Sequence, residues 1–155
     1  VAENGAGRAL MSLVYLDTSA LAKWYLPENG SETFSDWMQT QTETCISSLT
    51  MTEFRCLLAR KQRSQLLNPL QVQEVYAQFQ DDIRTGQLLR YAVADEHFLN
   101  AELLVERLPN VALRSMDALH LSIARDIGIE LLATADIVME KAARLLEVEV
   151  IFFGK

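Results

Sequence analysis

Two apolar runs of the same kind each lead into an aspartate, one near the start of the chain and one near its end. Asp17 follows the run at residues 13–16, and Asp136 follows the run at residues 131–135. Short apolar runs bounded by turn residues are typical of buried strands. If both strands belong to one parallel sheet, both aspartates lie at its carboxyl edge, where open α/β sheets bind ligands. The pattern therefore predicts an α/β fold with acids gathered at one edge of the sheet.

The rest of the chain alternates between strand-like and helix-like segments. Strands are expected over residues 13–16, 44–47, 88–93, 130–134 and 148–153. Helices are expected over residues 18–26, 31–41, 50–65, 69–86, 95–108, 115–127 and 137–146. Thr18 or Ser19 can cap the first helix, and the two helices between residues 50 and 86 follow each other directly. The alternation implies one three-layer α/β/α domain with a central parallel sheet and a helical hairpin.

Four acids at or near expected helix starts have a purely structural explanation. Asp17 and Asp136 can be helix N-caps, and Glu53 can be the far half of a capping box opened by Thr50. Asp117 lies in the first turn of its helix, where the helix dipole stabilises a carboxylate by roughly 0.3–1 kcal/mol. Taken one at a time, the structural explanation is favoured for each acid.

The same fold, however, brings the four acids together, and a cluster needs a different explanation. Two carboxylates 4 Å apart repel each other by on the order of 4 kcal/mol at an effective dielectric of 20. Mg²⁺ and Mn²⁺ are hard ions that take carboxylate oxygens and keep several waters. Such an ion can activate a water for in-line attack on a phosphodiester. The candidate metal ligands and catalytic residues are therefore Asp17, Glu53, Asp117 and Asp136.

Bulk properties narrow the class of protein. The net charge of −7 argues against a large basic face that holds nucleic acid, although a small basic patch remains compatible with it. The two cysteines, Cys45 and Cys56, form no CxxC motif, which indicates a reducing, cytoplasmic setting. No apolar stretch approaches the ~20 residues that a membrane helix needs, so no membrane partner is expected. Residues 1–10 are expected to be a tag or disordered leader, and residues 11–155 to form the domain.

The four acids lie in four short blocks of sequence. The blocks read LDTSAL at residues 16–21, SLTMTEF at 48–54, MDALHL at 116–121 and TAD at 134–136. In this order and at this spacing they resemble the PIN domain. In particular, they resemble the VapC-type toxins of bacterial and archaeal toxin–antitoxin systems, and the likeness spans residues 11–155.

This resemblance carries implications for activity, cofactor and partners. It implies a PIN-like, metal-dependent endoribonuclease with the four acids at a Mg²⁺ or Mn²⁺ site. The hydroxyl of Thr18 or Ser19 and that of Thr134 are then expected to support the site. The resemblance also implies a homodimer and a cognate antitoxin protein that covers the active site. Glu147 departs from the family pattern, which often has a glycine in the turn before the last strand.

Two further side chains are candidate RNA contacts. Arg60 lies seven residues after Glu53 on the same helix face and can meet an RNA phosphate, although a solvated helix face is the favoured explanation. His120 shares a helix face with Asp117, and it is either a phosphate contact or, as favoured, a hydrogen-bonded structural histidine. Both assignments stay open at the level of sequence.

Two other functions compete with the nuclease interpretation. One is a catalytically weak PIN-fold binding module that acts mainly through its antitoxin complex. The other is a phosphatase with Asp17 as nucleophile, but that chemistry usually has a second aspartate two residues on, where this chain has Ser19. The intact set of acids argues against the binding module.

Overall fold

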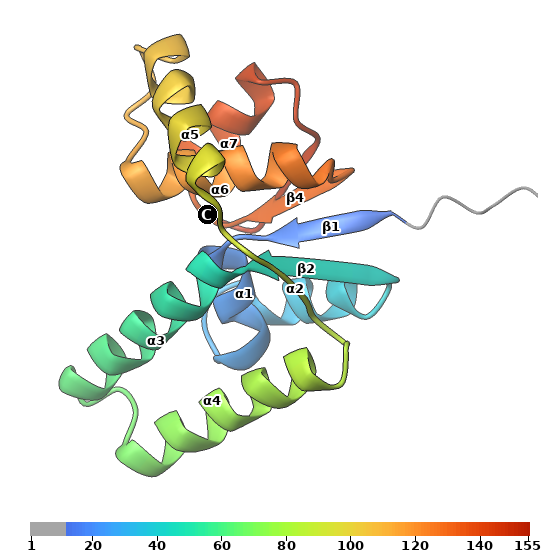
Figure 1. The fold of residues 1–155 in the computed structure, drawn as a ribbon. Helices are drawn as coiled ribbons and strands as arrows, with labels where there is room; N and C mark the ends of the chain where they lie inside the picture. Colours follow the sequence, from blue (N-terminus) through green and yellow to red (C-terminus); the bar gives the residue numbers. More distant parts are fainter. Residues whose placement is uncertain (1–11) are drawn as a thin grey trace, which may run out of the picture.

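The computed structural model describes residues 12–155, and the expected leader at residues 1–10 lies outside the described residues. Within residues 12–155 no helix is both long and apolar enough to cross a membrane. The described chain forms five strands and seven helices, in the order β1 (Leu13–Leu16), α1 (Thr18–Tyr25), α2 (Ser31–Met38), β2 (Glu43–Ser47), α3 (Ser48–Arg63), α4 (Pro69–Arg84), β3 (Leu89–Tyr91), α5 (Asp95–Arg107), α6 (Ser115–Ile127), β4 (Leu131–Thr134), α7 (Ile137–Leu145) and β5 (Val150–Phe152) (Figure 1).

The sheet is entirely parallel, with the strand order β3-β2-β1-β4-β5. Its central strand β1 has β2 on one side and β4 on the other, although β4 is far away in sequence. The amide of Asp17 donates to the carbonyl oxygen of Ala133 over 3.2 Å, which ties the end of β1 to the end of β4. The prediction that both apolar runs lie in one parallel sheet is therefore confirmed.

Alternate side chains of β1 pack against helices on opposite faces of the sheet. Tyr15 packs in a core cluster with residues of α5, α6 and α7. Val14 and Leu16 pack in a second cluster with residues of α1, α2, α3 and α4. Figure 1 shows these two groups of helices on opposite faces of the sheet. Because both faces are covered, the central strands β1 and β4 carry continuous apolar runs rather than alternating ones. The predicted three-layer α/β/α architecture is confirmed.

Helices α3 and α4 form the predicted helical hairpin, which projects from one side of the molecule (Figure 1). Asn68 caps α4, and its Oδ1 accepts from the amide of Gln71 over 2.9 Å, as expected from the Asn-Pro start. The rings of Phe54 in α3 and Phe79 in α4 lie edge to face with centroids 5.0 Å apart. These buried aromatic contacts hold the hairpin together.

The start of α1 decides between the caps expected from the sequence, and the start of α3 differs from its expected position. Helix α1 is capped by Asp17, whose Oδ1 accepts from the amide of Ala20 over 2.9 Å, and not by Thr18 or Ser19. Helix α3 begins at the end of β2, two residues before Thr50. The expected capping box of residues 50–53 therefore lies inside the helix and does not form, which leaves the Glu53 carboxylate free for other partners.

The turn before β5 accounts for the departure at Glu147. This residue has φ +58, in the left-handed region that glycine adopts most easily. Other residues pay roughly 1–2 kcal/mol there through contact between Cβ and the backbone. Glu147 therefore keeps the turn geometry that a glycine would have, at some cost in stability.

The two thiols differ sharply in access, and this difference can be measured. Cys45 is buried in β2, and burial together with the Glu43 carboxylate raises the pKa of its thiol to about 12. Cys56 is exposed on α3. Because the thiolate is the reactive form, we expect a maleimide at pH 7.5 to modify one thiol in the folded protein and two after unfolding. Intact mass spectrometry counts the adducts, and rapid double modification of the folded protein would contradict the burial of Cys45.

Candidate active site

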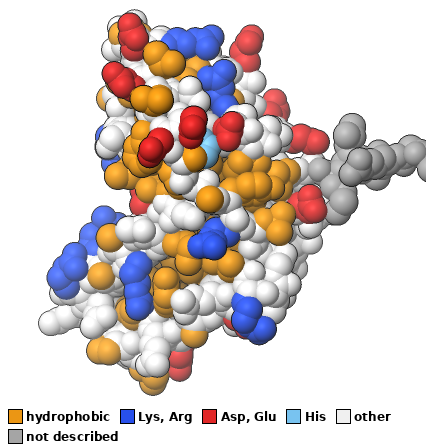
Figure 2. Space-filling view, in the orientation of Figure 1, with side chains coloured by type: hydrophobic (Ala, Val, Ile, Leu, Met, Phe, Trp, Pro, Cys, Tyr) orange, Lys and Arg blue, Asp and Glu red, His pale blue; other side chains and the backbone are white. Residues whose placement is uncertain are grey.

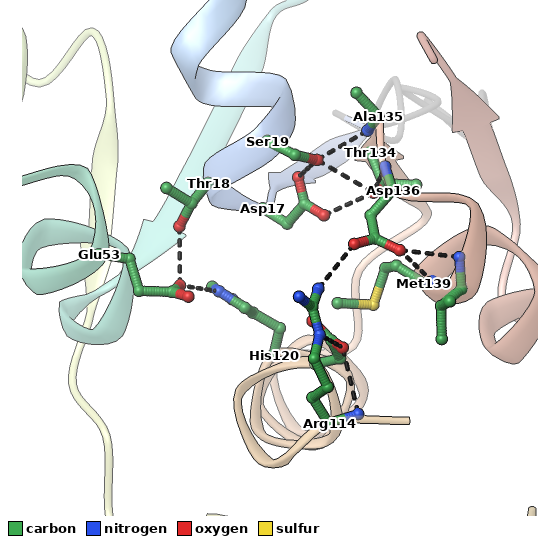
Figure 3. A network of polar contacts seen from close by, with 12 residues as sticks. Asp17, Thr18, Ser19, Glu53, Arg114, His120, Thr134, Ala135, Asp136 and Met139 are labelled. Atoms are coloured by element: carbon green, nitrogen blue, oxygen red, sulfur yellow. Dashed lines mark hydrogen bonds and ion pairs between the residues drawn. The ribbon is translucent and has the colours of Figure 1, made fainter. Parts of the chain in front are cut away.

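The carboxyl edge of the sheet opens into a cleft of about 560 Å³. It brings together all the predicted site residues except Thr134, which lies beside it and contacts Asp17. Figure 3 shows the side chains of Asp17, Glu53, His120 and Asp136 converging from the start of α1, from α3, from α6 and from the turn between β4 and α7. The cleft is lined by Asp17, Thr18, Ser19, Glu53, Arg60, Arg63, Arg114, Asp117, His120 and Asp136, among others.

Asp17 lies at the bottom of the cleft and is only 3% exposed. Its Oδ1 accepts from the hydroxyl of Ser19 over 2.7 Å as well as from the cap amide of Ala20, and its Oδ2 accepts from the hydroxyl of Thr134 over 2.5 Å. Burial raises the pKa of Asp17, although the His120 ring and these hydrogen bonds oppose the shift. A carboxylate so removed from water gains most from a nearby cation.

Glu53 enters the cleft from α3 and is held by two side chains. Its Oε1 accepts from the hydroxyl of Thr18 over 2.8 Å and pairs with Nε2 of His120. Burial raises the pKa of Glu53, but the contacts with His120 and Thr18 outweigh it, so the pKa lies below its usual value. Glu53 is therefore held as a carboxylate that points into the cleft.

The His120 ring is buried, and both of its nitrogens have partners. Its Nδ1 lies 2.7 Å from the hydroxyl of Tyr15, and its Nε2 contacts Glu53. The ring is 2% exposed, which leaves no nitrogen open to a phosphate. This geometry favours the alternative of a hydrogen-bonded structural histidine, in which His120 orients Glu53.

Asp117 and Asp136 are joined by Arg114, a residue that the sequence analysis did not single out. The guanidinium donates to Asp117 from Nε over 2.9 Å and from Nη2 over 3.3 Å. The same Nη2 donates to Oδ2 of Asp136 over 2.8 Å. The contacts with Asp117 and Asp136 raise the pKa of Arg114 further above its already high value. The signal in the sequence was the spacing, since an arginine three residues before a helical acid can reach it.

Asp136 is also the N-cap of α7. Its Oδ1 accepts from the amides of Val138 and Met139 over 2.8 and 3.2 Å. The structural explanation of Asp17 and Asp136 as helix caps is therefore confirmed, and both carboxylates nevertheless line the cleft. The two roles are compatible because one oxygen serves the cap while the other faces a neighbouring side chain.

The donors in the cleft fit a hard divalent cation by type, since they are carboxylate and hydroxyl oxygens. Their arrangement differs from a preassembled metal site: among residues 12–155 no group of three or more His, Cys, Asp or Glu is gathered closely enough to hold a metal ion. In this arrangement Arg114 supplies the positive charge between Asp117 and Asp136, and His120 engages Glu53. The acids are thus brought to one cleft, and some must exchange partners to share an ion.

One protein family matches this chain over most of its length. The sequence pattern of the PIN domain matches residues 14–145. Ribonuclease VapC35 from Mycobacterium tuberculosis is 30% identical over 147 residues, which cover 92% of this chain and 98% of that relative.

Solved structures share the fold at lower identity. Mycobacterium tuberculosis VapC20, described as a sarcin–ricin loop cleaving toxin, has a TM-score of 0.61 at 18% identity, with 83% of this chain and 94% of that one covered. Rickettsia felis VapBC2, bound to promoter DNA, has a TM-score of 0.63 at 17% identity, with 90% and 98% covered. These likenesses support the fold alone, whereas the family match spans most of the sequence. The chain belongs to the PIN domain family.

Proposed function

We propose that this protein is a divalent-metal-dependent endoribonuclease that cleaves RNA phosphodiester bonds as the toxin of a type II toxin–antitoxin module. The observation that carries the proposal is the convergence of four acids from four separate segments on one cleft. Membership of the PIN domain family and the 30% identity to a protein named as a ribonuclease support it. Capping of separate helices would not by itself bring Glu53 and Asp117 into the same cleft.

The proposed ligands of Mg²⁺ or Mn²⁺ are Asp17, Glu53, Asp117 and Asp136. When bound, such an ion supplies a nucleophilic water at neutral pH and stabilises the charge that develops on the phosphodiester. The other side chains prepare these acids for that role. Ser19 and Thr134 fix the two oxygens of Asp17, while Thr18 and His120 fix one oxygen of Glu53.

RNA cleavage by the purified protein tests this proposal. Cleavage is expected with Mn²⁺ and is expected to stop with chelator. A catalytically weak binding module would instead leave RNA intact under both conditions while still binding its partner protein. Intact RNA with Mn²⁺, from protein shown to be folded, would favour that alternative.

The basic residues of α3 are proposed to guide RNA to the cleft. Arg60 and Arg63 line the cleft on the same helix as Glu53. The guanidinium of Arg55 lies instead 4.0 Å from the ring centroid of Tyr76 on α4. Figure 2 shows Lys and Arg side chains over the arm formed by α3 and α4, in a protein whose net charge is −7. Arg60 and Arg63 therefore place positive charge in the same cleft as the four acids.

Replacing Arg60 and Arg63 together with alanine is expected to weaken the binding of single-stranded RNA at every sequence tested. Each lost phosphate contact lowers the slope of log affinity against log salt by about 0.7, so the double variant should lose about 1.4. Fluorescence anisotropy in chelator, at several salt concentrations, measures both effects. Arg55→Ala on the same helix is the matched control. If its salt slope equals that of the double variant, the assignment of Arg60 and Arg63 as phosphate contacts is wrong.

The protein is also proposed to act as a dimer and with a cognate antitoxin. Exposed apolar side chains on α5 offer a surface for another chain: Phe98, Leu99 and Leu103 are 57%, 63% and 59% exposed. Adjacent large apolar side chains of this kind are often covered by a protein partner. The Rickettsia felis VapBC2 structure, which shares this fold, was solved on promoter DNA.

A further inference from the structure

Arg114 holds its guanidinium between two acids from different segments of the chain. Its side chain is 70% exposed, yet it makes three hydrogen bonds to Asp117 and Asp136. A single exposed ion pair contributes little to stability. A planar guanidinium shared by two carboxylates is a stronger arrangement, because each hydrogen bond is charge-assisted.

Backbone contacts would keep both acids in place without this guanidinium. The amide of Arg114 itself donates to Oδ2 of Asp117 over 3.2 Å, and Oδ1 of Asp136 is held by the first turn of α7. The remaining oxygens are Oδ1 of Asp117 and Oδ2 of Asp136, and Nη2 of Arg114 binds both. The side chain thus occupies the two oxygens that the helix starts leave open.

We propose that Arg114 is a displaceable internal cation. Its guanidinium neutralises Asp117 and Asp136 until a divalent ion takes these two oxygens, and the released guanidinium then binds a phosphate of the RNA. The inference rests on the proposed nuclease function. The two oxygens cannot serve the guanidinium and the ion at full strength, so binding of the ion must release Nη2. The released group stays beside the cleft, because Arg114 is anchored just before α6. Its planar fork is suited to a phosphate.

Binding of Mn²⁺ to the wild type and to Arg114→Ala tests the first half of this inference, with free Mn²⁺ measured by electron paramagnetic resonance. Arg114→Ala is expected to bind Mn²⁺ about tenfold more tightly, equivalent to about 1.4 kcal/mol. Arg144→Ala is the matched control, because Arg144 is an exposed arginine that pairs with Glu140 outside the cleft. This control is expected to bind Mn²⁺ as the wild type does. Equal or weaker binding by Arg114→Ala would overturn the inference.

Binding of RNA tests the second half. Ca²⁺ takes the same type of oxygen ligand, and gel analysis shows whether the RNA stays intact during the measurement. With Ca²⁺, Arg114→Ala is expected to bind RNA about tenfold more weakly than the wild type, as loss of a charged hydrogen bond to phosphate implies. In chelator the difference is expected to be smaller, because the guanidinium is then engaged by the acids and only its neutralising charge is lost. An equal difference under both conditions, or no difference under either, would overturn the phosphate role.

Failure of the proposed function and failure of the role of Arg114 give different experimental results. If the wild type neither binds Mn²⁺ nor cleaves RNA, the proposed function is wrong. If the wild type does both and Arg114→Ala matches it in Mn²⁺ and RNA binding, only the role of Arg114 is wrong. Circular dichroism and melting of each variant show that the comparison is made between folded proteins.

Discussion

Replacing Asp117 with asparagine is expected to lower Mn²⁺-dependent RNA cleavage at least about 1000-fold. A loss of this size corresponds to roughly 4 kcal/mol of transition-state stabilisation, as expected when a ligand of a catalytic ion is lost. Asparagine keeps the size of the side chain and one oxygen, so the amide contact at the start of α6 can persist. Asp17→Asn is expected to abolish cleavage in the same way. Initial rates on a labelled RNA, with Mn²⁺ in excess, measure both losses.

Asp126→Asn provides the matched control for Asp117→Asn. Asp126 lies on the same helix and pairs with a histidine, His97, over 2.9 Å, but it does not line the cleft. This variant is expected to cleave RNA at close to the wild-type rate. Near-normal cleavage by folded Asp117→Asn would show that Asp117 is only a first-turn acid of α6.

Metal is expected to raise the melting temperature of the wild-type protein by about 5–10 °C. An ion that binds only the folded chain adds roughly 2.7 kcal/mol at about 100 times its dissociation constant. For a domain of this length each kcal/mol raises the melting temperature by about 2–4 °C. Differential scanning calorimetry in chelator and in millimolar Mn²⁺ measures the shift. No shift in the wild type would remove the physical basis of the proposed metal site.

Asp17→Asn is expected to shrink this metal-induced shift and to melt at a higher temperature than the wild type in chelator. An aspartate whose pKa is raised by folding binds its proton more tightly in the folded than in the unfolded chain, so its ionised form destabilises the fold. This destabilisation is absent below the ordinary pKa of 3.8 and develops as pH rises through the raised folded value. The advantage of Asp17→Asn in chelator should therefore be largest at neutral pH and vanish in acid.

Asp82→Asn separates the effect of the cleft from the effect of removing any buried carboxylate. Asp82 is 5% exposed and accepts from the hydroxyl of Tyr25 and from the side-chain Nε2 of Gln78, away from the cleft. Its metal-induced shift is expected to equal that of the wild type. An equally reduced shift in Asp82→Asn would mean that the metal acts elsewhere.

The sequence predicted the elements whose signals are local. The apolar runs before Asp17 and Asp136 became β1 and β4, and the Asn-Pro start of α4 at Asn68 was confirmed. These predictions succeed because burial on both faces forces a continuous apolar run and because capping depends on neighbours three residues away. The convergence of the acids followed from the parallel sheet rather than from any single motif.

Features that depend on partners distant in sequence could not be predicted in the same way. The start of α3 was misplaced because Thr50 and Glu53 match a capping box, whereas the helix already begins where β2 ends. The partners of Glu53 come from α1 and α6, and no residue near Glu53 in the sequence predicts its contact with His120. The bridge made by Arg114 depends equally on Asp136, which lies 22 residues further on.

The order of strands in the sheet also governs when activity can arise during biosynthesis. Strand β4 must insert beside β1 before Asp136 can meet Asp17, and the end of β4 is tied to Asp17 by a backbone hydrogen bond. A nascent chain emerges from its N-terminus and folds as its segments become available. The ribosome must therefore release nearly the whole domain before the four acids share a cleft. With the proposed site, a chain that ends before β4 lacks Asp136 and is expected to be inert toward RNA.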